Sequence, residues 1–385
     1  MDPTGQMRTL LVIDELDIGG TEQQLLEFVR RVPRARYAPL VCCFRYGRKA
    51  AEIAQLGIPV VHLPKRRRFD AGVIRRLASL MRRERVGIVH TFLIGANLWG
   101  RLAALIARVP VIVASERNVD VWEELPKRYI GKFLARFTDR IVANAEAVRS
   151  YLIARGVESK RVVTIRNGVD LGRFETPIDV GRVRSSLGVA PDDVLAAVVA
   201  RLEPQKGHDT VVDAAARLRE RCPRLRFVFV GGGSREAGLS ELVARNGLAD
   251  RIVFTGFRTD SAELIRAADL SILVSTREGL SNTLLESLAA GRPVIASRVG
   301  GNAEVVSPDV GVLVPPQDPA ALADALASLV ADPVSAARMG ARGKERVRRE
   351  FPVSRMVAET VALYDALDGA PAISAPGALR SSVLT

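Results

Sequence analysis

Short apolar runs rich in β-branched residues alternate with helix-like patterns along the chain and form two blocks. Runs in the first block cover residues 9–16, 37–44, 58–63, 87–91, 109–115, 139–144 and 161–165, and runs in the second cover 194–200, 226–231, 251–256, 270–275, 293–297 and 310–314. Short strands separated by helices are typical of a parallel sheet that is covered on both faces. The pattern therefore predicts an α/β protein of two doubly wound, Rossmann-like domains that face a cleft at the carboxyl ends of their strands.

The alternation breaks near residues 176–184, where Pro177 and Gly181 indicate a linker. We therefore expect a first domain over 1–180, a second domain over 181–352 and a C-terminal helix over 353–368. Residues 369–385 are small and include prolines, and we expect this tail to be disordered.

Composition narrows the class of protein without deciding it. The 385 residues are 48% hydrophobic and 26% charged, which is ordinary for a soluble globular protein. No apolar run reaches the roughly 18 residues that a membrane span requires, and the first apolar run is predicted to be a strand and not a signal peptide. The three cysteines show neither a disulfide framework nor a metal-binding spacing. A reducing cytoplasm fits these features best.

The net charge of +13 lies entirely in the first half of the chain. Residues 1–175 hold 31 Lys and Arg against 18 Asp and Glu, whereas residues 176–385 hold 25 of each kind. Part of the excess forms a stripe on a predicted helix, at Arg75, Arg76, Arg82 and Arg83. A basic amphipathic helix can bind an anionic membrane, but a solvated helix face gives the same pattern. A nucleic-acid footprint is less favoured, because this region has a single aromatic residue, Phe69.

Two glycines follow the first strand, in the segment DIGGTEQQLLEF. Gly19 and Gly20 present no side chain that would hinder a ligand, and Thr21 is a candidate N-cap for the helix that follows. An ordinary tight turn between a strand and a helix gives the same segment. The segment therefore indicates a ligand only together with other motifs.

The loop RLEPQKGHD follows the first strand of the second block and holds two cations, Arg201 and Lys206. Such a pair suits a diphosphate, because arginine offers a fork of donors and lysine a point charge, although paired surface cations are also common. The next two strands end in VGGG and FTGF. Gly231 and Phe257 there are candidates for contact with a nucleoside, even though the glycines do not fit a G-x-G-x-x-G fingerprint.

The segment TREGLSNTLLESLAAGRPVIAS places two carboxylates, Glu278 and Glu286, on either side of a predicted helix start. With Ser281 or Asn282 as N-cap and Gly291 as terminator, Glu278 lies in the loop and Glu286 within the first turns. A helix start attracts phosphate through its free N–H groups, which here belong to Gly279, Leu280, Ser281 and Asn282. Taken singly, the two glutamates also fit a loop acid near a helix dipole and a solvated helix carboxylate.

In combination, these motifs resemble the glycogen-synthase-like retaining glycosyltransferases, whose two-domain architecture is the GT-B fold. The hallmark of that family is a pair of glutamates with seven residues between them, here Glu278 and Glu286. The loops RLEPQKG, VGGG and FTGF and the first-domain glycine pair stand in the family's order, and IRNGVDLGRF at 165–174 matches a further family segment. The resemblance covers about residues 8–368.

The resemblance implies a nucleotide-sugar donor that is bound mainly by the second domain. Glu286 would hold the ribose hydroxyls, and Glu278 would contact the hydroxyls of the donor sugar. Arg201, Lys206 and the N–H groups of residues 279–282 would stabilise the departing diphosphate, so that no metal and no other cofactor is expected.

The resemblance also implies roles for the first domain. Gly20, with Gly19 beside it, would close over the phosphates, and the 353–368 helix would return to pack on this domain. Transfer would proceed with retention of the anomeric configuration and without a protein nucleophile.

One segment departs from the family pattern. Many relatives carry a histidine after the fifth strand of the first domain, where this chain reads VIVASERNVD. His90, at the end of GIVHT, and Glu116 are the candidates for contact with the reacting centre. A hydrogen-bonded structural histidine and a glutamate paired with Arg117 are the alternatives, so the chemistry on the acceptor side stays open.

The sequence therefore predicts a hexosyltransferase-type enzyme that moves a sugar from a nucleotide to an acceptor hydroxyl, in the synthesis of a cell-surface polysaccharide, exopolysaccharide or glycolipid. The acceptor is expected to be lipid-linked or a glycan, and the basic first domain is expected to touch an anionic membrane from the cytoplasmic side. A sugar-nucleotide epimerase of the same fold and, less favoured, a basic nucleic-acid-binding protein remain alternatives. The base, the sugar, the acceptor, the linkage and the oligomeric state are left open.

Overall fold

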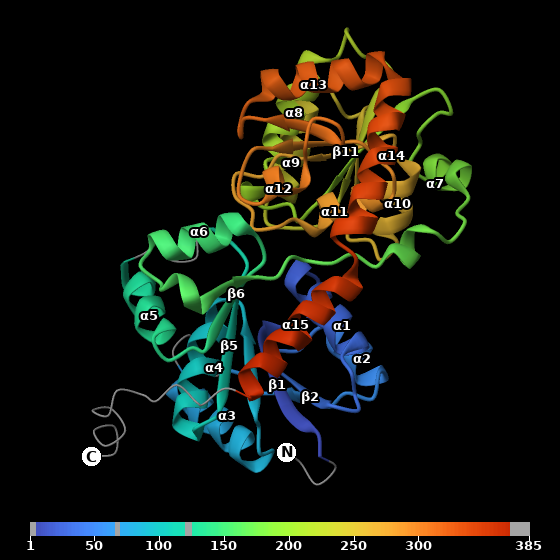
Figure 1. Cartoon of the computed structure of the whole chain (residues 1–385). Helices are drawn as coiled ribbons and strands as arrows, with labels where there is room; N and C mark the ends of the chain where they lie inside the picture. Colours follow the sequence, from blue (N-terminus) through green and yellow to red (C-terminus); the bar gives the residue numbers. More distant parts are fainter. Residues whose placement is uncertain (1–4, 66–69, 120–124, 370–385) are drawn as a thin grey trace. The chain divides into compact units, whose positions relative to one another are not determined.

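The structure is a computed structural model that describes residues 5–65, 70–119 and 125–369. Its contacts divide the chain into two compact units. Unit 1 consists of Met1–Asn167 with Ser354–Thr385, and unit 2 consists of Gly168–Val353. Each unit is built around its own parallel sheet with helices on both faces (Figure 1). The predicted fold class, two Rossmann-like α/β domains, is confirmed.

The sheet of unit 1 has a strand at each of the seven predicted runs. The strands are β1 (Met7–Glu15), β2 (Tyr37–Arg45), β3 (Val60–His62), β4 (Ile88–Phe92), β5 (Val111–Glu116), β6 (Arg140–Ala143) and β7 (Val162–Thr164). They follow the order β3-β2-β1-β4-β5-β6-β7, and all neighbouring pairs are parallel. Helices on both faces explain why these strands read as nearly continuous apolar runs.

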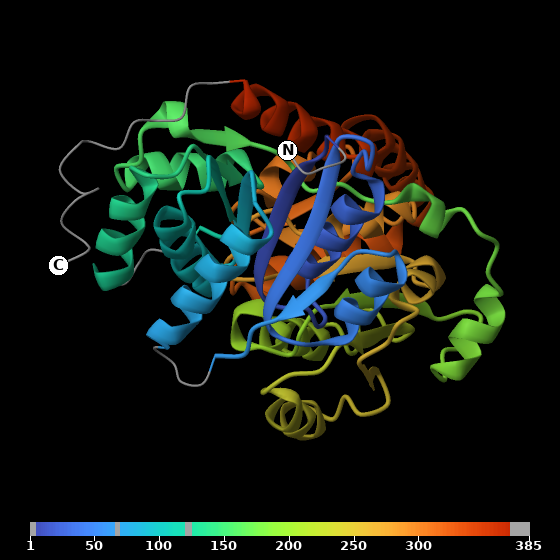
Figure 2. The ribbon, with the colours of Figure 1, turned by 90° about the horizontal axis from the view of Figure 1, so that it is seen from below.

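The helices of unit 1 are α1 (Gly20–Arg31), α2 (Arg48–Gln55), α3 (Ala71–Arg83), α4 (Ile94–Ala107), α5 (Leu125–Ala135), α6 (Glu146–Ala154) and α15 (Val353–Asp368). Figure 2 shows α3 and α4 on the opposite side of the sheet from α1 and α2. Leu10 and Val12 of β1 belong to the apolar cluster under α3 and α4. Because side chains alternate along a strand, their neighbours Leu11 and Ile13 point to the other covered face and are also buried.

The start of α1 differs from the prediction. The helix begins at Gly20 with Gly19 as N-cap and without a capping side chain, so Thr21 is not the cap. A Cβ on Gly19 would overlap the carboxylate of Glu22, which lies against the helix start.

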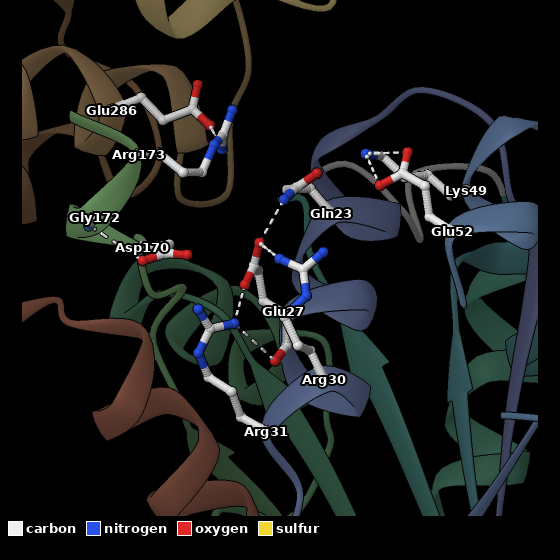
Figure 3. A network of polar contacts seen from close by, with 10 residues as sticks. All are labelled: Gln23, Glu27, Arg30, Arg31, Lys49, Glu52, Asp170, Gly172, Arg173 and Glu286. Atoms are coloured by element: carbon white, nitrogen blue, oxygen red, sulfur yellow. Dashed lines mark hydrogen bonds and ion pairs between the residues drawn. The ribbon is translucent and has the colours of Figure 1, made fainter. Parts of the chain in front are cut away.

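The buried carboxylate of Glu27 contacts three other side chains of α1. Glu27 accepts a hydrogen bond from Gln23 Nε2 at 2.7 Å, lies 3.6 Å from Arg30 Nη1 and is bonded by Arg31 Nη1. Figure 3 shows these three side chains turned toward it. Only 2% of Glu27 is exposed, and a buried charge of this kind is tolerated because it is paired and hydrogen-bonded.

The C-terminal helix α15 packs within unit 1 through a fully buried tyrosine. The Tyr364 ring meets Phe28 of α1 and Tyr37 of β2 edge-on, with ring centroids 5.9 and 5.7 Å apart. Tyr37 also donates a hydrogen bond to Asp365, and Arg36 lies 2.9 Å from the same carboxylate. These contacts fix the helix that was predicted at 353–368 against the sheet of unit 1.

Unit 2 has a strand at each of the six runs predicted for the second block. The strands are β8 (Val194–Val199), β9 (Leu225–Val230), β10 (Ile252–Gly256), β11 (Leu270–Leu273), β12 (Val294–Ser297) and β13 (Gly311–Val314). They follow the order β10-β9-β8-β11-β12-β13. The helices are α7 (Val180–Ser186), α8 (His208–Arg217), α9 (Glu236–Arg245), α10 (Ser261–Ala267), α11 (Asn282–Ala289), α12 (Asn302–Val305), α13 (Pro319–Ala331) and α14 (Pro333–Glu350).

The change between the units lies at 167/168, upstream of the boundary expected at 180/181. Val169 N donates to Phe351 O at 2.9 Å, and Val353 N donates to Val169 O at 3.0 Å. Arg266 of α10 also bonds the carbonyl oxygen of Thr176. Residues 168–180 therefore belong to unit 2. Pro177 and Gly181, which were predicted to lie in a linker, are part of this unit.

Two further predictions concern parts of the chain at the limits of the description. The tail expected to be disordered, 369–385, lies outside the described residues from 370 onward. Within the described residues, no single helix is both long enough and apolar enough to cross a membrane. Helices α13 and α14 meet these two criteria only when they are taken together, and this pair is bent by 102°.

Candidate functional site

The predicted donor-site residues of unit 2 lie on loops at one edge of its sheet. Arg201 and Lys206 follow β8, Gly231 follows β9, Phe257 follows β10 and Glu278 follows β11. These four strands are neighbours in the order β10-β9-β8-β11 and are parallel, so their carboxyl ends share one edge. Ligands of doubly wound sheets bind at this edge.

The first predicted glutamate is paired with the predicted lysine. Lys206 Nζ lies 2.6 Å from Glu278 Oε1, and Ser275 Oγ donates to the same oxygen at 2.7 Å. The side chains of Lys206 and Glu278 are 17% and 12% exposed. Thr276 N donates to Gln205 O at 2.8 Å and so joins the loop after β11 to the loop after β8.

The helix start between the two glutamates has the predicted geometry. Ser281 is the N-cap of α11 and accepts a hydrogen bond from Leu284 N at 3.4 Å, which decides between the two predicted caps. Gly291, with φ of +73°, follows the helix end at Ala289. Thr283 Oγ1 donates to Val199 O at 3.0 Å and ties the helix start to the end of β8.

The second predicted glutamate is paired with an arginine that the sequence did not single out. Arg173 Nη1 lies 3.3 Å from Glu286 Oε1, and the two side chains are 32% and 16% exposed. Figure 3 shows the arginine reaching toward the carboxylate from the segment Leu171–Phe174. The only sequence signal for Arg173 was its place in the family segment IRNGVDLGRF.

Glycines allow close backbone contacts around the edge. Gly231 has a φ of +143°, and a Cβ on it would overlap Ala200 O at the end of β8. Gly300 has a φ of +49°, and a Cβ there would overlap the carbonyl oxygen of Glu278. Gly301 N donates to Gly279 O at 2.7 Å. The loop after β12, whose VGGN glycines received no role from the sequence, therefore supports the loop that carries Glu278.

The remaining predicted contacts of unit 2 are exposed. Arg201 lies at the surface, and the Phe257 ring is 39% exposed. The neighbouring Glu203 accepts hydrogen bonds from Ser234 Oγ at 2.7 Å and Ser234 N at 3.2 Å, which together with the charge of Arg201 lower the pKa of that carboxyl. These bonds fix the loop after β8 to the loop after β9.

His90 in unit 1 does not have the geometry of a substrate contact. The ring is 3% exposed, with Nδ1 2.7 Å from Tyr364 Oη and Nε2 2.8 Å from Ser115 Oγ. Burial and then the nearby charge of Arg117 lower its pKa to about 3. Both nitrogens are occupied inside the unit, which favours the structural histidine that was its alternative, and contact of His90 with the reacting centre stays a prediction.

Glu116 is also buried, with 2% of the residue exposed. Burial lowers the pKa of Arg101 to about 10, and the charge of Glu116 opposes that shift. Burial likewise lowers the pKa of Arg117 to about 10, against the opposing charge of Glu22. Arg117 Nη2 donates to Asn167 Oδ1. Unit 1 thus holds a group of buried and partly buried charged side chains, of which Glu22 and Arg101 were not singled out from the sequence.

A metal site was not expected, and the geometry offers no candidate for one. Across 5–65, 70–119 and 125–369, no three or more His, Cys, Asp and Glu side chains come together as metal ligands would.

Family models match both units. Residues 18–173 match the model "Glycosyltransferase Family 4", and residues 180–346 match the model "Glycosyl transferases group 1". EpsD of Bacillus subtilis is 33% identical over 243 residues, which are 62% of this chain and 63% of EpsD. The chain thus spans less than two thirds of that relative.

Two further similarities extend over more of the relative's length. The lipopolysaccharide core biosynthesis mannosyltransferase LpsB of Rhizobium meliloti is 30% identical over 268 residues, which are 68% of this chain and 72% of LpsB. The crystal structure of Anabaena HepE in complex with UDP-glucose covers 94% of this chain and 100% of HepE, with a TM-score of 0.86 and 25% identity. The chain therefore belongs to the group 1, family 4 glycosyltransferases, a retaining family of nucleotide-sugar enzymes with the GT-B fold.

Proposed function

We propose that the protein transfers a hexose from a UDP-linked donor, held by unit 2, to a hydroxyl group of a lipid-linked or glycan acceptor, with retention of configuration. The observation that carries the proposal is the pair of half-buried ion pairs, Lys206–Glu278 and Arg173–Glu286, on either side of the α11 start. UDP is favoured because HepE was solved with UDP-glucose. A hexose is favoured because LpsB is named a mannosyltransferase.

The proposed roles follow from position and charge. The diphosphate lies against the α11 start, where Lys206, Arg201 and the N–H groups of residues 279–282 carry positive charge toward it. As the bond from the anomeric carbon to the phosphate oxygen breaks, negative charge grows on that oxygen, and fixed donors stabilise it. The acceptor oxygen forms the new bond on the same face, and its proton passes to the departing phosphate.

The two glutamates bind hydroxyl groups and not phosphate. Ionised carboxylates are acceptors only, so Glu278 accepts from the hydroxyls of the hexose and Glu286 from those of the ribose. Their cations limit the repulsion between these carboxylates and the phosphates. Phe257, an exposed ring at the end of β10, is placed to stack on the base beside Gly231.

The acceptor and the place of action are inferred from a relative and from the cysteines. LpsB is named for synthesis of the lipopolysaccharide core, which favours an acceptor carried on a lipid. Cys42, Cys43 and Cys222 are free and buried, which suits a reducing compartment. We therefore place the reaction at the cytoplasmic face of a membrane. Membership of a glycosyltransferase family argues against the nucleic-acid-binding alternative. Analysis of the reaction product tests the other alternative, a sugar-nucleotide epimerase.

The test is a thermal-shift panel of UDP, GDP, ADP and their common sugar conjugates. A ligand at about 100 times its dissociation constant stabilises the native state by roughly 2.7 kcal/mol. UDP and one UDP-hexose should raise the melting temperature of the wild type and fail to raise that of Glu286→Ala. The matched control is Glu345→Ala, which removes a 69%-exposed carboxylate on α14 and should keep the shift.

Other outcomes of the panel would contradict the proposal at different points. A shift with GDP or ADP conjugates alone would refute the choice of base. No shift with any nucleotide would refute the donor site itself. Conversion of the sugar on the nucleotide without any acceptor would show an epimerase.

A further inference from the structure

Helix α5 of unit 1 carries a cluster of large apolar side chains on its outer face. Tyr129, Ile130 and Phe133 are 69%, 45% and 45% exposed. Because Tyr129 and Ile130 stand four and three positions before Phe133, both lie next to Phe133 on the helix surface. Gly131, Leu134 and Ala135 are buried on the inner side. The inner side of α5 therefore packs on unit 1, while its outer side exposes apolar side chains.

Single exposed apolar residues need no explanation, but a cluster of them does. The other exposed large apolar residues of the described chain stand apart in sequence, at Ile18, Tyr46, Ile94, Ile106, Val180, Phe257 and Val334. The outer face of α5 continues into Phe137, whose ring centroid lies 5.2 Å from that of Phe133. Aromatic rings thus form a row along this side of the helix.

The charged residues within the segment 125–138 have one sign. Lys132 and Arg136 are exposed beside it, and no acidic residue occurs from 125 to 138. The arginine stripe of α3 differs in this respect. Arg76 is paired with Asp70 at 3.0 Å and Arg83 with Glu84 at 3.1 Å. Part of the charge that suggested membrane binding from the sequence is therefore neutralised on α3, whereas that of α5 is not matched by acids along its own segment.

We propose that the outer face of α5 docks on an anionic lipid surface. Tyrosine and phenylalanine rings settle at the boundary between headgroups and acyl chains, and lysine and arginine bind the anionic headgroups. The absence of acids from the segment favours this partner over a second copy of the chain. The inference rests on the proposed function only in that a lipid-linked acceptor is presented at such a surface.

The test is flotation with vesicles of phosphatidylcholine alone and of phosphatidylcholine with phosphatidylglycerol. Wild type should float only with the anionic vesicles. Tyr129→Ser with Phe133→Ser should lower the partition coefficient at least about tenfold, and Lys132→Gln should lower it about fivefold. The matched control is Val334→Ser, which removes a 64%-exposed apolar residue of α14 and should change binding less than twofold.

A fluorescent variant tests insertion directly. The Phe133→Trp variant adds a third tryptophan to the two native ones. Its additional fluorescence, obtained by subtracting the wild-type spectrum, should shift to the blue on anionic vesicles. Lipids that are brominated near the headgroup end of the acyl chain should quench this fluorescence. Absence of both changes would overturn the proposal. So would stronger loss of binding in Arg75→Gln with Arg82→Gln than in the α5 double variant, because α3 would then be the docking element.

Two controls separate this inference from its alternatives. Sedimentation that shows a wild-type dimer and a monomeric α5 double variant, without vesicle binding by either, would assign the face to a second copy of the chain. The double variant should keep the wild-type melting temperature and the thermal shift with UDP. Failure of vesicle binding with an intact UDP shift would overturn the docking face alone, and loss of the UDP shift in the wild type would overturn the donor site alone.

Discussion

Replacement of His90 by glutamine tests whether this histidine supports the fold or the chemistry. In the folded protein its pKa is lowered to about 3, mainly because burial disfavours the charged ring. In the unfolded chain the ordinary value of about 6.5 applies. Since the folded pKa lies below the unfolded one, the stability linked to His90 is fully present above pH 6.5 and is lost as the pH falls toward 3.

The size of the effect follows from these two values. At pH 5 the unfolded histidine has taken up a proton that the folded one has not, which costs about 2 kcal/mol of unfolding free energy relative to pH 7.5. Other groups titrate in the same interval, but they are common to wild type and variant. The change in stability from pH 7.5 to pH 5 should therefore be about 2 kcal/mol larger in the wild type than in His90→Gln.

The assay is urea unfolding of both proteins at the two pH values, with turnover of the donor measured at pH 7.5. Glutamine also loses part of the hydrogen bonding to Tyr364 and Ser115, so a constant loss at both pH values is expected. Tyr364→Phe removes only the hydroxyl and serves as a control that keeps His90. Equal pH dependence in wild type and His90→Gln would refute the buried neutral histidine. A hundredfold loss of turnover in the folded variant, with stability unchanged, would return His90 to the catalytic site.

Four further changes test the fold and the donor site. Burial lowers the pKa of His208 to about 4, so His208→Gln should likewise reduce the loss of stability of unit 2 from pH 7 to pH 5 in urea unfolding. Lys206→Met should lower kcat about 10²- to 10³-fold in donor turnover, because the departing diphosphate loses a fixed cation. Gly300→Ala strains a positive φ and overlaps the carbonyl oxygen of Glu278; it should cost at least about 1 kcal/mol in urea unfolding and weaken the UDP-hexose thermal shift. Glu27→Gln should cost about 1–3 kcal/mol in urea unfolding, because Arg30 and Arg31 lose the charged acceptor that Glu27 provides.

The strands were predictable because their signal is local. A buried parallel strand is a short apolar run between turn residues, and each of the thirteen runs became a strand. The boundary between the units has no such local signal in the sequence. It depends on hydrogen bonds of Val169 with Phe351 and Val353, nearly the whole second unit away in sequence. Pro177 and Gly181 indicate from the sequence only a break in the alternation, and nothing in the residues around them shows which unit this segment joins.

The site was predictable where backbone geometry sets it and not where distant side chains complete it. Ser281 as N-cap and Gly291 as terminator follow from capping chemistry. The burial of His90 depends on Tyr364, 274 residues further along the chain. A histidine at a strand end looks the same in sequence whether a substrate or a tyrosine occupies its nitrogen, so only the packing of α15 decides between them.

The spacing of the two glutamates is explained by what each one faces, not by contact between them. The helix starts between them at Ser281, and each carboxylate receives a cation from far upstream. Lys206 lies 72 residues before Glu278, and Arg173 lies 113 residues before Glu286. Two unpaired carboxylates would repel a diphosphate, whereas two paired ones leave the positive charge of Arg201 and of the helix start available to it. Such an edge offers acceptors for the hydroxyls of two sugars and positive charge for the phosphates between them, which is the charge pattern of a nucleoside diphosphate sugar.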